Sequence, residues 1–186
     1  DGRSVNIASQ TVSGVDIQAA YRYELQSYGA ITAALSGGWL DESKTTPLPG
    51  DHEYDCSGLF GTTCETVNPE WRHVMRVGWE TPWNVLVSLQ WRHIGEVELD
   101  TNTSDETLSN GRHDSFNAKM DAQDYFDLSA IWEATDNISV RAGINNLFDE
   151  EPPLISNTIT GTGSPNSYPT YDQLGTEMFV GITASF

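Results

Sequence analysis

Residues 178–186, MFVGITASF, carry the pattern that decides the fold. Side chains of one parity are mainly apolar: Met178, Val180, Ile182, Ala184 and Phe186. Side chains of the other parity are mostly small or polar: Phe179, Gly181, Thr183 and Ser185. A period of two indicates a β-strand whose faces meet different surroundings. The last residues of soluble domains usually fray into water, so an alternating strand that ends on an aromatic ring favours a strand with one face against an apolar medium.

Six further stretches alternate in the same way. The predicted strands are residues 5–25, 28–39, 70–80, 84–92, 124–133 and 137–148, followed by 178–186. Short turns near residues 26–27, 81–83 and 134–136 alternate with long loops at residues 40–69, 100–123 and 149–173. Short turns at one end and long loops at the other are typical of outer-membrane barrels, so the sequence predicts an all-β, antiparallel, up-and-down transmembrane β-barrel segment.

The number of strands predicts where the chain starts. If the last strand ends on the periplasmic side, seven strands place the beginning of the first one outside the cell. A complete barrel begins in the periplasm and has an even number of strands. We therefore expect further strands upstream of residue 1.

Most of the sequence resembles known outer-membrane proteins. Gly181, Ala184 and Phe186 resemble the C-terminal signal by which barrels are recognised for insertion. INNLFDEEPP (residues 144–153) and SYPTYDQLGTEMFVGITASF (167–186) resemble the closing segments of TonB-dependent outer-membrane receptors, and CSGLFGTTCETVNPEWRH (56–73) and SGVDIQAAYRYEL (13–25) extend the likeness. Two positions depart from the usual pattern: Thr176 replaces a basic residue and Phe179 a polar one.

This resemblance implies a receptor and its partners. Residues 1–186 would be the C-terminal part of a 22-stranded barrel, with the N-terminal plug, its TonB box and the earlier strands lying outside this sequence. The receptor would take up a scarce solute, a ferric siderophore, a cobalamin-like molecule or an oligosaccharide, with energy from the inner-membrane TonB complex. It would be a multi-pass protein of a Gram-negative outer membrane, in contact with lipid and with the barrel-insertion machinery, and would need no cofactor.

Aromatic residues separate toward the two ends of the predicted strands, as the interface girdles of barrels do. The predicted membrane-interface residues are Trp71, Trp79, Trp83, Trp91, Trp132 and Phe186. Trp71 to Trp79 spans roughly 27 Å of strand, or about 20 Å of height once tilted, which is close to the apolar band.

The repeated tripeptide WRH, at residues 71–73 and 91–93, points to the lumen. A hairpin turning at residues 81–83 puts Arg72 opposite Arg92 near the outer mouth. Like charges this close destabilise a sheet unless an acid intervenes, so we expect an acidic partner from a neighbouring strand or the plug, or else an anionic ligand. The candidate residues of a ligand vestibule are Arg72, Arg92, Trp39, Tyr168 and Tyr171.

Cys56 and Cys64 are the two cysteines of the chain. They lie in one glycine- and threonine-rich stretch, without the spacing of a zinc or redox motif. A disulfide across an outer loop is the favoured interpretation and free thiols the alternative.

Composition excludes several classes. A formal net charge of -18 argues against nucleic acid as a partner, and no run is long enough for a membrane-spanning helix. The histidines, His52, His73, His93 and His113, show no metal-ligand spacing, and no catalytic motif occurs, so the sequence predicts neither a metal site nor an enzyme. Acidic loops are expected to be mainly solvated surface, with divalent-cation sites as the alternative.

Two other folds fit part of the pattern. A small closed barrel with a structural or adhesive role would need an eighth strand near residues 1–10. A soluble carbohydrate-binding β-sandwich would bury Trp71, Trp79, Trp83 and Trp91 in its core.

Overall fold

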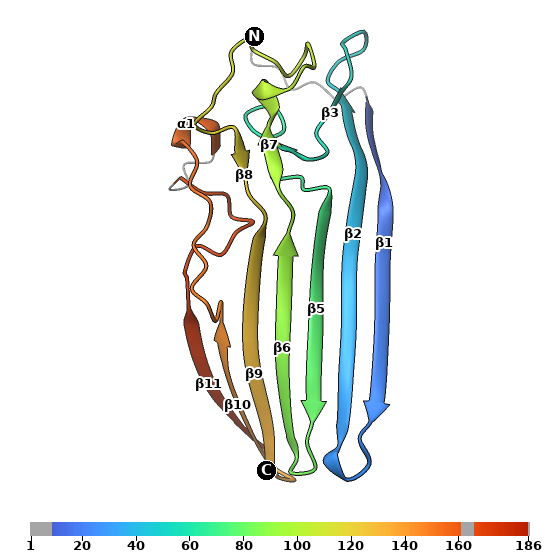
Figure 1. Ribbon diagram of the computed structural model, residues 1–186, viewed down its shortest axis with the longest axis vertical. Coiled ribbons are helices and arrows are strands. Elements are labelled where there is room, and N and C mark those ends of the chain that lie inside the picture. The colour runs from blue at the N-terminus through green and yellow to red at the C-terminus, as the bar shows by residue number, and fades with distance from the viewer. Residues whose placement is uncertain (1–8, 161–165, 186) are drawn as a thin grey trace.

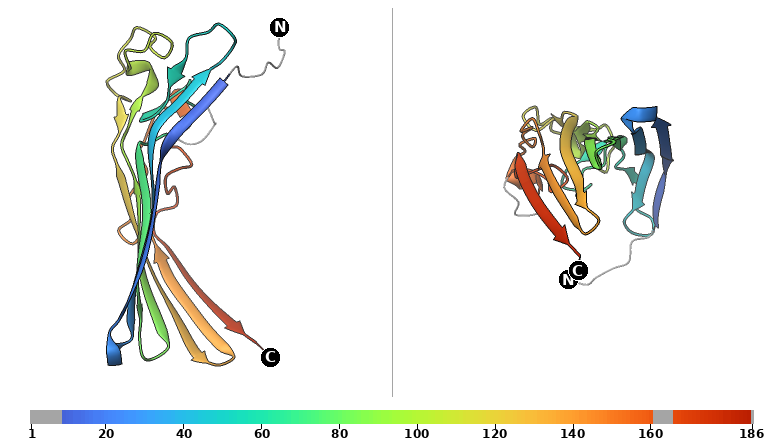
Figure 2. Two further views of the ribbon diagram at one scale, coloured as in Figure 1. Left: turned by 90° about the vertical axis from the view of Figure 1, so that its right-hand side faces the viewer. Right: turned by 90° about the horizontal axis from the view of Figure 1, so that it is seen from below.

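Seven long strands form one antiparallel sheet in the order of the sequence. The structure is a computed structural model that describes residues 9–160 and 166–185. The strands are β1 (Ser9–Glu24), β2 (Ala30–Thr46), β5 (Trp71–Glu80), β6 (Val85–Ile94), β9 (Gln123–Thr135), β10 (Ile138–Asn145) and β11 (Glu177–Ala184). The sheet is twisted and bends into an arc that leaves β1 and β11 as its two edges (Figure 1, Figure 2). The fold class is as predicted.

Tight connections lie at one end of the sheet and long loops at the other (Figure 1). A short 3-10 helix, Gln26–Tyr28, joins β1 to β2, and four residues join β5 to β6. At the opposite end the long loops carry β3 (Tyr54–Asp55), β4 (Leu59–Phe60), β7 (Val97–Leu99), β8 (Lys119–Met120), a 3-10 helix (Asp100–Asn102) and α1 (Asn157–Thr160). We call this end the outer end.

The strand pairing puts the predicted apolar residues on one face of all seven strands. One row across the sheet reads Tyr23, Ile31, Trp79, Val87, Ala130, Ala142 and Val180. These side chains are not covered by other parts of the chain: Leu89 is 42% exposed and Ile182 72% exposed. We call this surface the apolar face and its opposite the polar face.

The exposed apolar face contradicts the soluble sandwich. Trp83 is 68% exposed and Trp79 37% exposed, whereas a sandwich would bury both. The small closed barrel fails as well, because β1 runs continuously from Ser9 to Glu24 and β1 and β11 are not paired with each other in the described residues.

The β5–β6 hairpin corrects the predicted register by two residues. His73 pairs with His93 and Val74 with Arg92, so Arg72 is not opposite Arg92 but opposite Ile94. The cause is a longer turn, in which Asn84 adopts φ 59° and the Thr81 N–H donates to the carbonyl of Val85 at 2.8 Å. A shift by two residues leaves every side chain on its predicted face.

Several element ends also differ from the prediction. β2 continues to Thr46, and short strands occupy parts of both segments predicted as loops, residues 40–69 and 100–123. β10 ends at Asn145 rather than 148, because Asn146 turns the chain with φ 49°. Residues 5–8 of the first predicted strand and Phe186 lie outside the described residues.

Two glycines on the polar face lie under side chains of the neighbouring strand. A Cβ at Gly143 would come within 2.5 Å of the ring of Phe179, its partner in β11. A Cβ at Gly181 would lie 2.9 Å from Nε of Arg141, its partner in β10. Each glycine therefore leaves the space that its partner's side chain occupies.

Candidate ligand vestibule

The outer loops fold together around the main buried core of the described chain. β4 pairs with β7 in parallel, and β7 pairs with β8 antiparallel. Their core consists of Phe60, Val67, Val97, Leu99, Met120, Ile155, Tyr168 and Tyr171. Burial of these side chains gives the loops a fixed shape beyond the end of the sheet.

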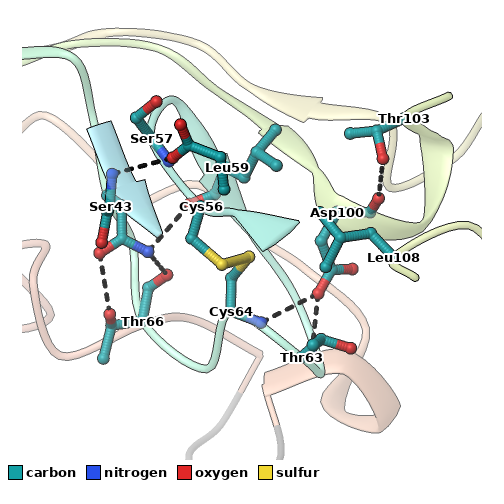
Figure 3. Close-up of a disulfide and its surroundings, with 12 residues drawn as sticks. Ser43, Cys56, Ser57, Leu59, Thr63, Cys64, Thr66, Asp100, Thr103 and Leu108 are labelled. Carbon is teal, nitrogen blue, oxygen red and sulfur yellow. Dashed lines mark hydrogen bonds between the residues drawn. A yellow bond between two sulfur atoms is a disulfide. The ribbon is translucent and has the colours of Figure 1, made fainter. Parts of the chain in front are cut away.

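A disulfide and a buried carboxylate fasten this unit. Cys56 and Cys64 are joined with an S–S distance of 2.02 Å (Figure 3). Asp100 is fully buried, and its Oδ2 accepts hydrogen bonds from the N–H groups of Thr63 at 2.8 Å and Cys64 at 3.1 Å. A side chain at Gly61, where φ is 146°, would collide with this carboxylate. Because Cys64 is one end of the disulfide, the two N–H groups that bind Asp100 lie at the end of the loop that the disulfide closes.

Arg92 lies in an ion network on the polar face. It donates from Nε to Oδ2 of Asp127 at 2.8 Å and from Nη2 to Oδ1 at 2.9 Å, a two-point contact between strands β6 and β9. Its Nη2 also approaches Asp172 in the last long loop at 3.4 Å, and its guanidinium lies 5.0 Å from the centre of the Tyr125 ring. The acidic partner expected from a neighbouring strand is thus Asp127.

Asp127 also fixes the start of the last loop. Its Oδ1 accepts the N–H of Asn146 at 3.0 Å, and its Oδ2 accepts Nε2 of Gln90 at 3.1 Å. Asn146 is fully buried and exchanges two hydrogen bonds with the backbone of Glu150. The loop is in this way attached to the polar face of the sheet.

Arg72 has a different environment. It is exposed, and within the described residues no carboxylate or other side chain bonds its guanidinium. Asp16 and Gly38 share its row across the sheet, and a Cβ at Gly38 would lie 3.1 Å from Oδ1 of Asp16.

A cavity of about 1010 Å³ opens beside Arg72 at the outer end of the sheet. The polar-face strands contribute Asp16, Gln18, Ser36, Arg72, Val74 and Arg92, and the loops contribute Val67, Asn68, Pro69 and Thr170. Its volume is at the upper end of the range for small-molecule sites. A cation without an ion-pair partner in the described residues, one carboxylate and several hydroxyl and amide groups let it bind a polar solute of mixed character.

Three predicted vestibule residues lie differently from Arg72 and Arg92. Trp39 borders the cavity, but it pairs with Val15 and Trp71 on the apolar face. Tyr168 and Tyr171 are 2% and 3% exposed in the loop core. Burial and the nearby charge of Asp100 raise the pKa of Tyr168 to about 12, and burial also raises the pKa of Tyr171. Both are therefore neutral packing residues with the loops in this position.

Some contributors were not predicted from the sequence. Asp16 was not named as a site residue, and Asp127 and Asp172 are 35 and 80 residues from Arg92. The alternation of each strand could have placed Asp16 and Asp127 on the polar face. It could not have predicted which residues of the neighbouring strands lie beside them.

Neither a spanning helix nor a metal site is found. No helix within residues 9–160 and 166–185 is long and apolar enough to cross a membrane. In the same ranges no three His, Cys, Asp or Glu side chains are grouped so that they could hold a metal ion.

An antiparallel up-and-down sheet with one apolar and one polar face, tight turns at one end and long folded loops at the other, defines a segment of a β-barrel. The chain belongs to the TonB-dependent receptor-like β-barrel family, whose profile matches residues 1–147. No curated protein matches the sequence.

Solved structures with the same fold are ferric enterobactin receptors of Pseudomonas aeruginosa. One mutant receptor is 14% identical with a TM-score of 0.63, and another, solved in complex with enterobactin, is 16% identical with the same score. In both cases the match covers 97% of this chain and 23% of the receptor chain. The chain thus spans about a quarter of the length of these receptors, and at this identity the likeness concerns the fold.

Proposed function

We propose that residues 1–186 form the C-terminal part of the barrel of an outer-membrane receptor that takes up a scarce solute by TonB-energised transport. The observation that carries the proposal is the family match together with a cavity on the polar face, beside the exposed Arg72. The solute is a ferric siderophore, a cobalamin-like molecule or an oligosaccharide. The plug, the TonB box and the remaining strands belong to the rest of the receptor.

The apolar face supports a location in the outer membrane of a Gram-negative bacterium. It presents a continuous apolar surface to the surroundings, with aromatic rings toward both ends, as lipid-facing strands do. Trp71 and Trp91 lie toward the outer end, and Trp79, Trp83 and Trp132 toward the turns. Gly181 and Ala184 in β11 would serve as part of the insertion signal, together with Phe186.

In this receptor Arg72 contacts the solute, whereas Arg92 supports the wall. Arg92 is already neutralised by Asp127 and Asp172, while Arg72 is exposed at the cavity. An arginine fork suits a planar anionic oxygen pair, and Asp16 suits a hydroxyl or amine.

The test is uptake by cells that lack the receptor gene and carry the full-length receptor on a plasmid. A panel of labelled iron chelates, corrinoids and glycans should identify one solute whose uptake needs both the receptor and TonB. Surface binding of that solute should persist without TonB. A receptor whose loss leaves uptake of the whole panel unchanged is not a transporter of these solutes.

An Arg72→Ala receptor should bind the identified solute roughly 10-fold more weakly, as expected for loss of one charge-assisted hydrogen bond. Arg112→Ala, in an outer loop away from this cavity, is the matched control. Equal binding by the wild type and the Arg72→Ala receptor would remove Arg72 from the site.

A further inference from the structure

A group of polar and aromatic side chains lies on the apolar face, near the outer end of the sheet. His73, His93 and Asp124 form one row across β5, β6 and β9. The row next to it, toward the tight turns, contains Met75, Trp91 and Phe126. We call these residues and Trp71 the outer histidine cluster.

Hydrogen bonds determine the tautomers of the two imidazoles. Nε1 of Trp71 donates to Nδ1 of His73 at 3.0 Å, and an indole nitrogen can only donate, so this Nδ1 carries no proton. Nδ1 of His93 lies 2.7 Å from Oδ1 of Asp124, which also accepts Nε1 of Trp91 at 2.6 Å. A carboxylate only accepts, so the Nδ1 of His93 carries the proton.

The two Nε2 atoms therefore have opposite roles when the rings are neutral. Nε2 of His73 is a donor and Nε2 of His93 is an acceptor. The rings are stacked, with centroids 5.1 Å apart and planes inclined by 21°. In the described part of the chain no group bonds either Nε2 atom.

A donor and an acceptor side by side fit a hydroxyl group, which needs one of each. They do not fit a metal ion, because one of the two nitrogens has no free lone pair. Aromatic rings continue from this pair: Trp91 is stacked on Phe126 at 6.0 Å and 9°, and Phe148 meets Phe126 edge-on at 5.5 Å. Such faces accept the C–H side of a sugar ring while its hydroxyls turn toward the histidines.

The position of the cluster identifies the source of the sugar. It is continuous with the apolar face, whose rows toward the turns contain Leu89 and Leu128. A molecule bound here has apolar surface directly below its polar group, as an acyl chain requires. We infer that the outer histidine cluster binds the sugar headgroup of a glycolipid in the outer leaflet of the membrane, an inference that rests on the membrane location proposed above.

The test uses the full-length receptor in nanodiscs of phosphatidylethanolamine and phosphatidylglycerol with a minor fraction of a monoglucosyl diacylglycerol. Lipids that stay with the receptor after delipidation are measured by mass spectrometry. We expect the glycolipid to be enriched over phospholipids of the same chain length. His73→Phe and His93→Phe keep an aromatic ring but each remove one hydrogen bond, so each should reduce the enrichment roughly fivefold, and the double variant tenfold or more.

His113→Phe, in an outer loop, is the matched control and should retain the enrichment. A heat-dependent mobility shift confirms that each variant is folded, and the single variants remain informative if the double variant is not. No enrichment by the wild type, or full enrichment by the folded double or single variants, would each overturn the inference. Solute uptake is recorded separately, so failure here is distinguishable from failure of the proposed transport function.

Discussion

At the scale of single residues, Asp127 is the most connected polar group of the polar face. It accepts hydrogen bonds from Arg92, Gln90 and the backbone of Asn146, and its side chain is 14% exposed. It joins two strands and a loop. Removal of its carboxylate leaves a partly buried guanidinium without its main partner.

Asp127→Ala should therefore lower the free energy of unfolding by about 2 kcal/mol, less than for a fully buried ion pair because the Arg92 side chain is 32% exposed. Urea unfolding of the full-length receptor in detergent measures this value. Asp121→Ala is the control, because the pair of Asp121 with Lys119 is exposed and should contribute little to stability. Equal effects of both substitutions would contradict this role.

Asp55 in β3, in the first outer loop, makes the stability of that loop depend on pH. Burial alone would raise the pKa of its carboxyl, but the N–H groups of Ser57 and Ser43, both at 2.9 Å, hold that pKa below its ordinary value. A carboxyl with a depressed pKa in the folded state stabilises the fold above its unfolded pKa of about 4 and loses this effect as the pH falls through the folded pKa.

Protease cleavage near residues 43–57 should thus increase as the pH is lowered below about 4, and Asp55→Asn should remove most of this acid-dependent change. Cleavage by pepsin over an acidic pH series measures it. Asp51→Asn, at an exposed position in the same loop, should keep the wild-type pH dependence.

The sequence predicted on which face of the sheet a strand residue lies better than it predicted which residue pairs with it on the neighbouring strand. Parity follows from local alternation and placed Arg72 and Arg92 on the polar face. Their rows depended on one turn, which proved longer because Asn84 adopts φ 59°. The partners Asp127 and Asp172 come from distant segments, and nothing local to Arg92 indicates them.

At the scale of elements, the seven strands were found wherever one face is apolar. The outer end of β2 was missed because residues 41–46, DESKTT, are polar on both faces and show no alternation. Residues 42–46 pair with β1, and Asp41 lies at a bulge. β4, β7 and β8 have two or three residues each, too few to show a period. Their pairing comes from the shared loop core rather than from local pattern.

The disulfide lies in a second buried cluster of the outer loops, in which Cys56 and Cys64 pack with Leu108. Closing nine residues, Cys56 to Cys64, restricts the unfolded loop by about 2–3 kcal/mol in the chain-entropy view. A Cys56→Ala/Cys64→Ala receptor should be cleaved faster by thermolysin within residues 47–70, with the seven long strands left intact.

The cleavage sites are identified by mass spectrometry. Thr107→Ala, at an exposed position of the neighbouring outer loop, is the control for general sensitivity to substitution. If the double variant is cleaved no faster than the wild type, the disulfide does not stabilise the loop of residues 47–70.

At the scale of the whole molecule, charge is unevenly distributed. Residues 41–70, 95–124 and 146–176 hold 19 acidic and three basic residues. In the strands, arginines lie on the polar face: Arg22, Arg72, Arg76, Arg92 and Arg141. The outer end is therefore strongly negative, and the wall behind it is nearly balanced.

This distribution should steer solutes by charge. At low salt, cationic forms of the transported solute should associate faster than anionic ones, and the difference should shrink as salt rises to about 0.5 M, where screening is short-ranged. Stopped-flow binding to the full-length receptor measures both rates. A rate that does not depend on salt would show that the outer acids do not guide entry.

The ring of Phe179 over Gly143 bears on how the final strand finds its place. If β11 were shifted along β10 by two residues, Phe179 could lie opposite the large side chain of Arg141. The space above Gly143 would then stay empty. Arg141 over Gly181 is the same kind of fit, with the large side chain on β10 and the glycine on β11. The fit of these side chains on the polar face therefore selects the correct register of β10 and β11. The apolar side chains of the same two strands are alike in character and would allow several registers.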